Sequence, residues 1–186
     1  MKHPEVFLIP VFSLADYFLT LVGAVLREKK FGHHFKTELY ELNPVWQSVI
    51  AEKKWFNPKH LLLTIIETSA LVFVIEFGDI PETFVEIVLG FFLVGNGILV
   101  GRHLDNILTF WHVIRKPGEI SGQVSITHAL VLSMSMYKQV VVAVPLILIL
   151  LFAPSPFMVG ATLVCVLQIL THLIWIWKYK KKQEKN

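Results

Sequence analysis

Acidic and polar side chains occur inside stretches of this sequence that are otherwise strongly apolar. Asp16 lies in the first stretch and Glu67 in the second, and no Lys or Arg lies at the same depth to neutralise either acid. An ionised carboxylate at the centre of a membrane helix costs about 2.5–3.5 kcal/mol on insertion scales. Three states reduce that cost: a protonated acid that hydrogen-bonds between helices, an acid paired with His172 or Arg102, or an acid that holds a cation. The third state predicts a binding site.

Counting residues from the nearest basic anchor places these groups at similar depths. At 1.5 Å per residue, Asp16 lies ~16 Å from Arg27 and Glu67 lies ~12 Å from Lys59. By the same rise, the polar residues of the third and fifth stretches each lie ~9 Å from their own anchors. We therefore predict one ion- or proton-binding cluster in the cytoplasmic half of the membrane, formed by Asp16, Glu67, Asn96 and His172.

A second polar group follows the third apolar stretch, where we expect the cytoplasmic mouth of the site. His103 and Asp105 are two residues apart, so they point to different sides of a regular helix and do not chelate one metal ion together. His112 and His128 flank a turn and are expected to face each other across a hairpin. An amphipathic helix with an ordinary Arg–Asp surface pair is the simpler interpretation. The predicted mouth residues are Glu41, Asn43, Arg102, His103, Asp105, Asn106, His112 and His128.

The sequence contains no compact metal-ligand motif and no nucleophile motif. We therefore predict no cofactor apart from a cation at the intramembrane acids, and we assign no catalytic residue and no metal ligand.

Asp16 and Thr20 are one helical turn apart, and Glu41-Leu42-Asn43-Pro44 follows in the next connector. This pattern resembles one in small uncharacterised prokaryotic integral-membrane proteins and covers the first quarter of the chain. The resemblance implies that Asp16 and Glu41 belong together, and it implies no particular chemistry.

Five apolar stretches must position these residues. The chain is 54% hydrophobic and only 17% charged, as expected for a polytopic membrane protein. We predict an all-α fold in which residues 1–186 form a single membrane domain. The expected elements are spans over 6–26, 58–77, 81–102, 138–153 and 157–177, an interfacial helix over 44–55 that Asn43-Pro44 starts, and a hairpin over 103–137.

The third and fourth helices are longer than a bilayer requires. Residues 81–115 reach ~52 Å as one helix and residues 123–152 reach ~45 Å, whereas the hydrocarbon core is ~30 Å thick. Either both helices project beyond the membrane, or each bends near Arg102 and Lys138. The helical period continues through residues 102–116, which favours a hairpin that projects into the cytoplasm.

Basic residues are distributed asymmetrically between the connecting segments. Of the 17 Lys and Arg residues, all except Lys2 fall within 27–59, 102–138 and 178–186. The positive-inside rule therefore predicts an N-terminus outside the cell, a cytoplasmic C-terminus and a multi-pass location in the cell (plasma) membrane, the inner membrane of a prokaryote. These basic residues indicate topology and contact with lipid headgroups, so nucleic acid is not an expected partner.

Four glycines on the third helix predict a close helix–helix contact. Because 186 residues are few for a self-contained transport path, we expect a homo-oligomer formed through this strip of Gly90, Gly95, Gly97 and Gly101.

Three functions are compatible with this sequence. The favoured one is a small channel or transporter for a cation or a proton-coupled solute. The second is a membrane-embedded metal-dependent enzyme that acts on a lipid or isoprenoid at the cytoplasmic face. The third is an assembly or scaffold subunit whose hairpin and basic tail bind a partner. The enzyme would draw its acid, base and metal ligands from Asp16, Glu41, Glu67, His103, Asp105 and His172.

Overall fold

A computed structural model describes residues 2–37 and 40–184, and it confirms the all-α fold. Five helices in the described residues are long and apolar enough to cross a membrane. They cover Pro4–His34, Pro58–Phe77, Glu82–Arg115, His128–Phe152 and Pro156–Gln183.

The first of these helices is longer than its predicted span of 6–26. It begins with a 3₁₀ turn (η1, Pro4–Phe7), continues as α1 (Leu8–Leu26), widens to a π turn (η2, Arg27–Phe31) and ends in α2 (Gly32–His34). Arg, Glu and Lys all have good helix propensity, so a charged run can leave the apolar layer without ending the helix. The basic run over 27–30 therefore continues the helix beyond Leu26, with residues 28–30 exposed.

The connector after α2 contains less helix than predicted. It holds a strand, β1 (Phe35–Thr37), and a five-residue helix, α3 (Gln47–Ala51), in place of the expected helix over 44–55. Asn43 Oδ1 accepts from the Val45 N–H at 3.1 Å, so the Asn-Pro pair caps a turn before the helix begins. Lys53 has φ 53°, a left-handed conformation that ends the helix.

The other long helices start at local capping signals. Asn57 accepts from the N–H groups of Lys59 and His60, which starts α4 (Pro58–Phe77) where the Asn-Pro signal predicts it. Thr127 caps α6 (His128–Phe152) and Ser155 caps α7 (Pro156–Gln183) in the same way. The longest helix, α5 (Glu82–Arg115), is uninterrupted despite its glycines.

The turn between α5 and α6 carries a feature that the sequence did not predict. It contains a 3₁₀ turn, η3 (Pro117–Glu119), and a strand, β2 (Val124–Ile126), which pairs in parallel with β1. His34 Nδ1 also donates to the Gly122 carbonyl oxygen at 2.9 Å. The connector is therefore attached to the tip of the α5–α6 hairpin.

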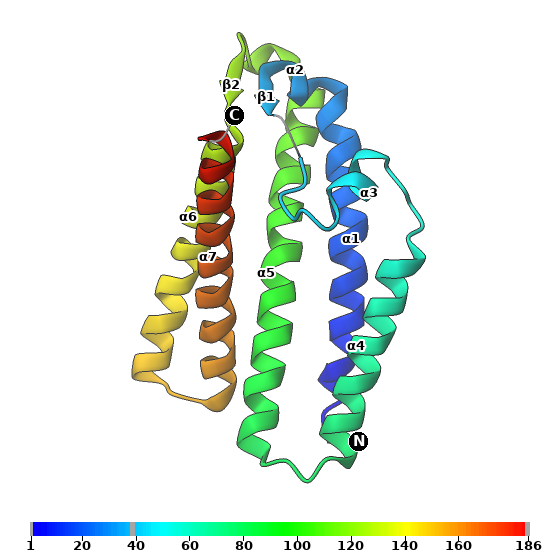
Figure 1. Cartoon of the computed structure of the whole chain (residues 1–186), viewed down its shortest axis with the longest axis vertical. Coiled ribbons are helices and arrows are strands. Elements are labelled where there is room, and N and C mark those ends of the chain that lie inside the picture. The colour runs from blue at the N-terminus through cyan, green and yellow to red at the C-terminus, as the bar shows by residue number, and fades with distance from the viewer. Residues whose placement is uncertain (1, 38–39, 185–186) are drawn as a thin grey trace.

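The helices form a row in which α5 packs against both α1 and α7 (Figure 1). The two flanking helices, α4 and α6, pack on the outer sides of α1 and α7. At one end of the row α5 and α7 touch through their backbones. A Cβ on Gly160 would lie 1.9 Å from the Ile87 carbonyl oxygen, and one on Gly90 would lie 2.1 Å from that of Phe157.

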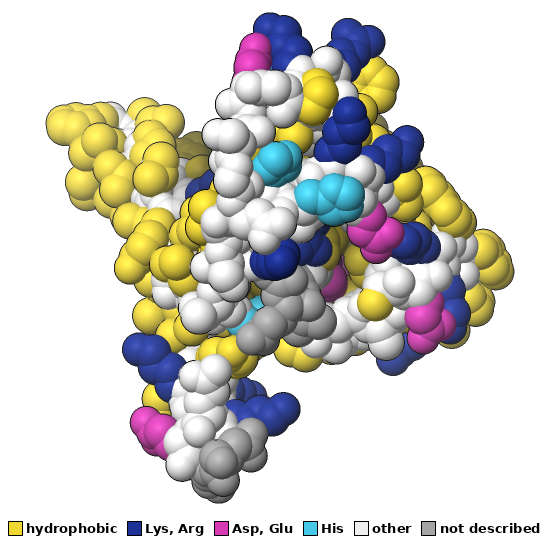
Figure 2. Space-filling view, turned by 90° about the horizontal axis from the view of Figure 1, so that it is seen from above, with side chains coloured by type: hydrophobic (Ala, Val, Ile, Leu, Met, Phe, Trp, Pro, Cys, Tyr) yellow, Lys and Arg dark blue, Asp and Glu magenta, His cyan; other side chains and the backbone are white. Residues whose placement is uncertain are grey.

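The opposite end, which holds α2, β1, β2 and the end of α7, is called the basic end below. Seen onto this end, Lys and Arg side chains are spread over the surface and hydrophobic side chains surround them (Figure 2). The first residues of the chain lie at the other end, where the Lys2 N–H donates to Glu76 and His3 Nε2 lies 2.8 Å from Glu82.

The predicted glycine strip of α5 divides into two parts. Gly90 and Gly95 face α7 of the same chain, where a Cβ on Gly95 would lie 2.7 Å from Val164. A Cβ on Gly97 or Gly101 would meet nothing within 4 Å. Half of the strip thus serves packing within the chain.

Candidate functional site

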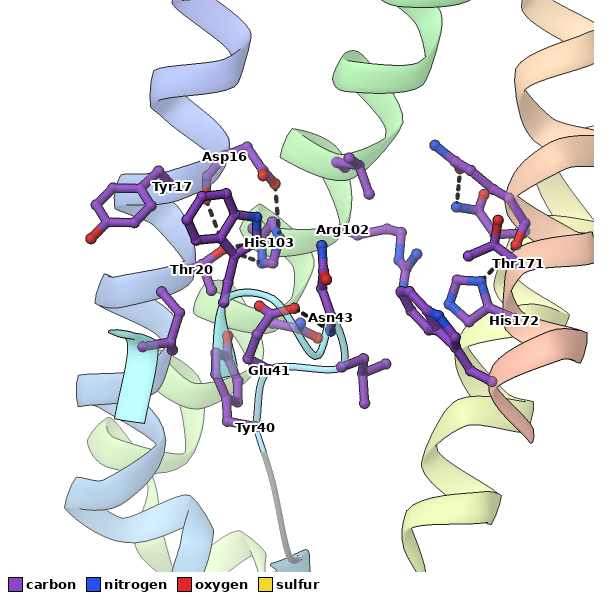
Figure 3. A pocket seen from close by; sticks show the side chains of 18 of the residues that line it. Asp16, Tyr17, Thr20, Tyr40, Glu41, Asn43, Arg102, His103, Thr171 and His172 are labelled. Carbon is purple, nitrogen blue, oxygen red and sulfur yellow. Dashed lines mark hydrogen bonds and ion pairs between the residues drawn. The ribbon is translucent and has the colours of Figure 1, made fainter. Parts of the chain in front are cut away.

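A cavity of about 290 Å³ lies in the half of the fold nearer the basic end, and five helices and the connector contribute to its walls (Figure 3). Its polar and ionisable lining residues are Asp16, Tyr17 and Thr20 of α1, Tyr40, Glu41 and Asn43 of the connector, His60 of α4, Arg102, His103 and Asn106 of α5, Gln139 of α6, and Gln168, Thr171 and His172 of α7.

On the α1 side, Asp16, Thr20 and His103 form one hydrogen-bonded group. Thr20 donates its only hydroxyl proton to the backbone carbonyl of Asp16 at 2.7 Å, so its oxygen is left to accept. His103 Nε2 lies 3.1 Å from that oxygen and 3.0 Å from Asp16 Oδ1. Nε2 therefore donates to Thr20 Oγ1, and the Asp16 carboxylate lies beside the same nitrogen.

The connector places Glu41 over the middle of the cavity. Tyr40 is anchored against α1, because its hydroxyl fills the space above Gly23, where a Cβ would lie 2.1 Å away. The Asn43 N–H donates to Glu41 Oε1 at 2.6 Å, which fixes the carboxylate. Burial raises the pKa of the Glu41 carboxyl, although the Asn43 N–H and the nearby His103 oppose that shift. Glu41 is therefore an acid that binds a proton more readily than a solvated one.

On the α7 side, Arg102, Ser135 and His172 form a second group. His172 Nδ1 lies 2.8 Å from the Gln168 backbone carbonyl, which can only accept, so Nδ1 carries the proton. Its Nε2 lies 2.8 Å from Ser135 Oγ and accepts from that hydroxyl, and Ser135 accepts in turn from Arg102. Every group in this chain of hydrogen bonds is satisfied when His172 is neutral.

Two glutamines form a further polar contact in the cavity wall. Gln139 has no solvent-exposed surface, and its amide nitrogen donates to Gln168 Oε1. Gln139 Oε1 has no hydrogen-bond partner in the described part of the chain. The sequence did not predict Gln139 as a site residue, because it directly follows Lys138 at the expected membrane boundary. An amide side chain next to a run of Val residues is the signal that could have identified it.

The structure brings together most of the predicted polar residues and unites the two predicted groups. Asp16 and His172, from the intramembrane cluster, line the same cavity as five of the predicted mouth residues: Glu41, Asn43, Arg102, His103 and Asn106. Asp16 and Glu41 both line this cavity.

Five predicted residues lie elsewhere. The exposed Glu67 does not line the cavity, and Asn96 donates to the Phe92 carbonyl of its own helix at 2.9 Å. Asp105 pairs with Lys138 at 3.0 Å on the surface. His112 contacts Glu119 at 2.6 Å and the His128 ring lies 5.1 Å from that of Tyr179, so the two histidines do not face each other.

Within residues 2–37 and 40–184, no group of three His, Cys, Asp or Glu side chains is placed to hold a metal ion. Of the ligand pool considered for a metal-dependent enzyme, Asp105 and Glu67 lie outside the cavity, and the other four residues line it.

No protein-family model, no curated protein and no solved structure matches this chain.

Proposed function

We propose that the protein is a small transporter of the plasma membrane that binds a cation, or a proton together with a solute, in the cavity near its basic end. The basic end faces the cytoplasm in this proposal, in accordance with the positive-inside rule. The observation that carries the proposal is the Asp16–His103 pair, 3.0 Å apart, on the wall of a cavity that several helices share.

The charge of the lining supports a monovalent cation or a proton as part of the cargo. With neutral histidines and both acids ionised, Asp16 and Glu41 contribute −2 and Arg102 contributes +1, so the lining carries −1, and a proton on Glu41 is one way to remove it. A net charge in a site of low dielectric constant is costly, and one bound positive charge removes it.

Proton binding has several candidate groups in the lining. The Asp16 carboxylate and the His103 imidazole, 3.0 Å apart, are one such pair of groups. His172 instead has both ring nitrogens engaged, with the Gln168 carbonyl and with Ser135, which is bonded to Arg102. The titratable or charged groups that face this cavity are Asp16, Tyr17, Tyr40, Glu41, His60, Arg102, His103 and His172.

The packing of α5 on α7 favours a carrier over a continuous pore. Gly90 and Gly160 bring the two helix backbones into contact in the half away from the basic end. A solute in the cavity would leave by that route only after α5 and α7 separate, which is the alternating access of carriers.

Purified protein in liposomes tests the proposal. A pH-sensitive dye inside the vesicles reports proton movement while Na⁺, K⁺ or a mixture of amino acids is supplied on one side. Asp16→Asn should reduce flux by about tenfold or more, the loss expected when an interaction of about 1.4 kcal/mol is removed. Glu67→Gln is the matched control, because it neutralises an acid of the neighbouring helix outside the cavity.

Wild-type flux at the level of empty liposomes for all of these probes would refute the proposal. Equal losses of flux in the Asp16 and Glu67 variants would show that transport does not depend on this cavity.

A further inference from the structure

We propose that the solute is a small zwitterion that carries an ammonium group and a carboxylate. The inference rests on the proposed function in using the same cavity, and it adds the class of the ligand.

Acceptors for an ammonium group occupy the α1 side of the cavity and its middle. Asp16 and Glu41 are both on the lining, and each is close enough to His103 for the charges to interact. The hydrogen bonds that the structure gives to each carboxylate leave lone pairs free, since an ionised carboxyl accepts about four hydrogen bonds. An ammonium group supplies three donors and one positive charge for these oxygens.

A donor for a carboxylate lies further along the same cavity. Arg102 gives one hydrogen bond to Ser135, and a guanidinium has five N–H donors in a planar fork. The remaining donors suit the two oxygens of a carboxylate, which binds Arg in a bidentate manner. Arg102 lies between the acids and the α7 wall (Figure 3), so a ligand with both groups reaches both partners.

The size of the cavity and the rest of its lining favour an organic ligand over a bare ion. About 290 Å³ holds on the order of ten waters at roughly 30 Å³ each. Trp46, Trp175 and Leu99 add apolar surface that a hydrated ion does not use. The completely buried Gln139 presents an unpartnered Oε1 at the cavity wall, which points to a ligand or water that donates a hydrogen bond.

A matched series of small molecules tests the inference on the purified full-length protein. The probes are 4-aminobutyrate, n-butylamine, which lacks the carboxylate, and butyrate, which lacks the ammonium group; glycine and β-alanine vary the spacing between the charges. Binding is measured by calorimetry in detergent. At least one zwitterion should bind about tenfold or more tightly than both single-charge analogues, because each charged contact contributes about 1.4 kcal/mol or more.

Two variants test which residue binds the ammonium group of the ligand and which binds its carboxylate. Asp16→Asn should reduce the affinity for the zwitterion towards that for butyrate, and Arg102→Lys should weaken it while butylamine binding is retained. Arg102→Lys keeps the positive charge, and thermal unfolding of each variant confirms that it is folded before binding is measured.

Butylamine binding as tightly as every zwitterion, or no binding by any member of the series, would overturn the inference. Proton-coupled flux of K⁺ or Na⁺ with no zwitterion binding refutes this inference and leaves the proposed transport intact. Zwitterion binding without flux into liposomes refutes the proposed transport and leaves the class of ligand intact.

Discussion

The two cavity histidines differ in what surrounds them. His103 Nε2 lies 3.0 Å from Asp16 Oδ1 and 3.1 Å from Thr20 Oγ1, so it faces a carboxylate. The Nε2 atom of His172 accepts from Ser135, which is itself bonded to Arg102, so His172 belongs to a satisfied hydrogen-bond network that holds the guanidinium. We therefore expect His103 to act with Asp16 in the proposed site and His172 to position Arg102.

Glu41 provides a test of the cavity at the residue scale. Burial raises its pKa above the ordinary value of 4.5, so the folded protein holds a proton at a pH where the unfolded chain has released it. Stability therefore decreases as pH rises from that ordinary value through the raised one. Glu41→Gln should be more stable than wild type above this window and equal to it below. Thermal unfolding in detergent between about pH 4 and 8 measures the difference, since unperturbed Glu titrates at the lower end of that range.

The matched control is Glu52→Gln, which alters an exposed acid of the same connector. A Glu41 variant that tracks wild type at every pH would show that Glu41 is not buried in the folded protein.

At the scale of elements, local capping predicted helix starts, but depth along a helix did not predict which way a side chain points. Asn57 starts α4 where the sequence indicates. On that helix Thr64 faces α1, where its hydroxyl lies 3.0 Å from Ser13. Glu67, three residues later, is rotated by about 60° at 100° per residue, which is enough to leave the interface. Counting residues along a helix gives the height of a side chain and not its rotation, so it predicted Glu67 beside Asp16, whereas Glu67 does not line the cavity.

In the connector, by contrast, the strands could not be predicted from the sequence, although two residues of the cavity lining could. Three-residue strands such as β1 and β2 have too little pattern to be predicted, and their pairing joins segments almost ninety positions apart. Glu41 and Asn43 were nevertheless predicted at the mouth of the site, because the Glu41-Leu42-Asn43-Pro44 pattern carries the resemblance that groups Glu41 with Asp16, and both residues line the cavity.

The contact between α5 and α7 provides a test at the element scale. Gly160→Ala places a methyl group 1.9 Å from the Ile87 carbonyl oxygen, so the helices must move apart. The expected loss of stability is about 1–3 kcal/mol, as for overpacked cores. Gly97→Ala is the control, since a Cβ there meets nothing within 4 Å, and better helix propensity should leave it neutral or slightly stabilised. Denaturation by sodium dodecyl sulfate in mixed micelles, followed by circular dichroism, compares the two. Equal midpoints would show that α5 and α7 do not touch at Gly160.

At the scale of the whole molecule, the row of helices has a closed half and a half with a cavity. Backbone contacts at Gly90 and Gly160 close the half that contains the start of the chain, and the polar cavity lies towards the basic end. The cavity therefore lies towards the end of the protein where the basic residues are concentrated. If that end faces the cytoplasm, the conformation described here is one in which the site is on the cytoplasmic side.

Orientation decides which compartment the cavity serves, and two single-cysteine variants determine it. Asp79 is exposed between α4 and α5 at the end away from the basic end, and Lys182 is exposed near the end of α7. Each is changed to Cys in a Cys165→Ala background, which removes the one native cysteine, a buried one. Because basic segments remain in the cytoplasm, a membrane-impermeant maleimide should label Asp79→Cys in intact cells and Lys182→Cys only after permeabilisation. Labelling in the reverse order would place the basic end outside, and the cavity would then take its cargo from the exterior.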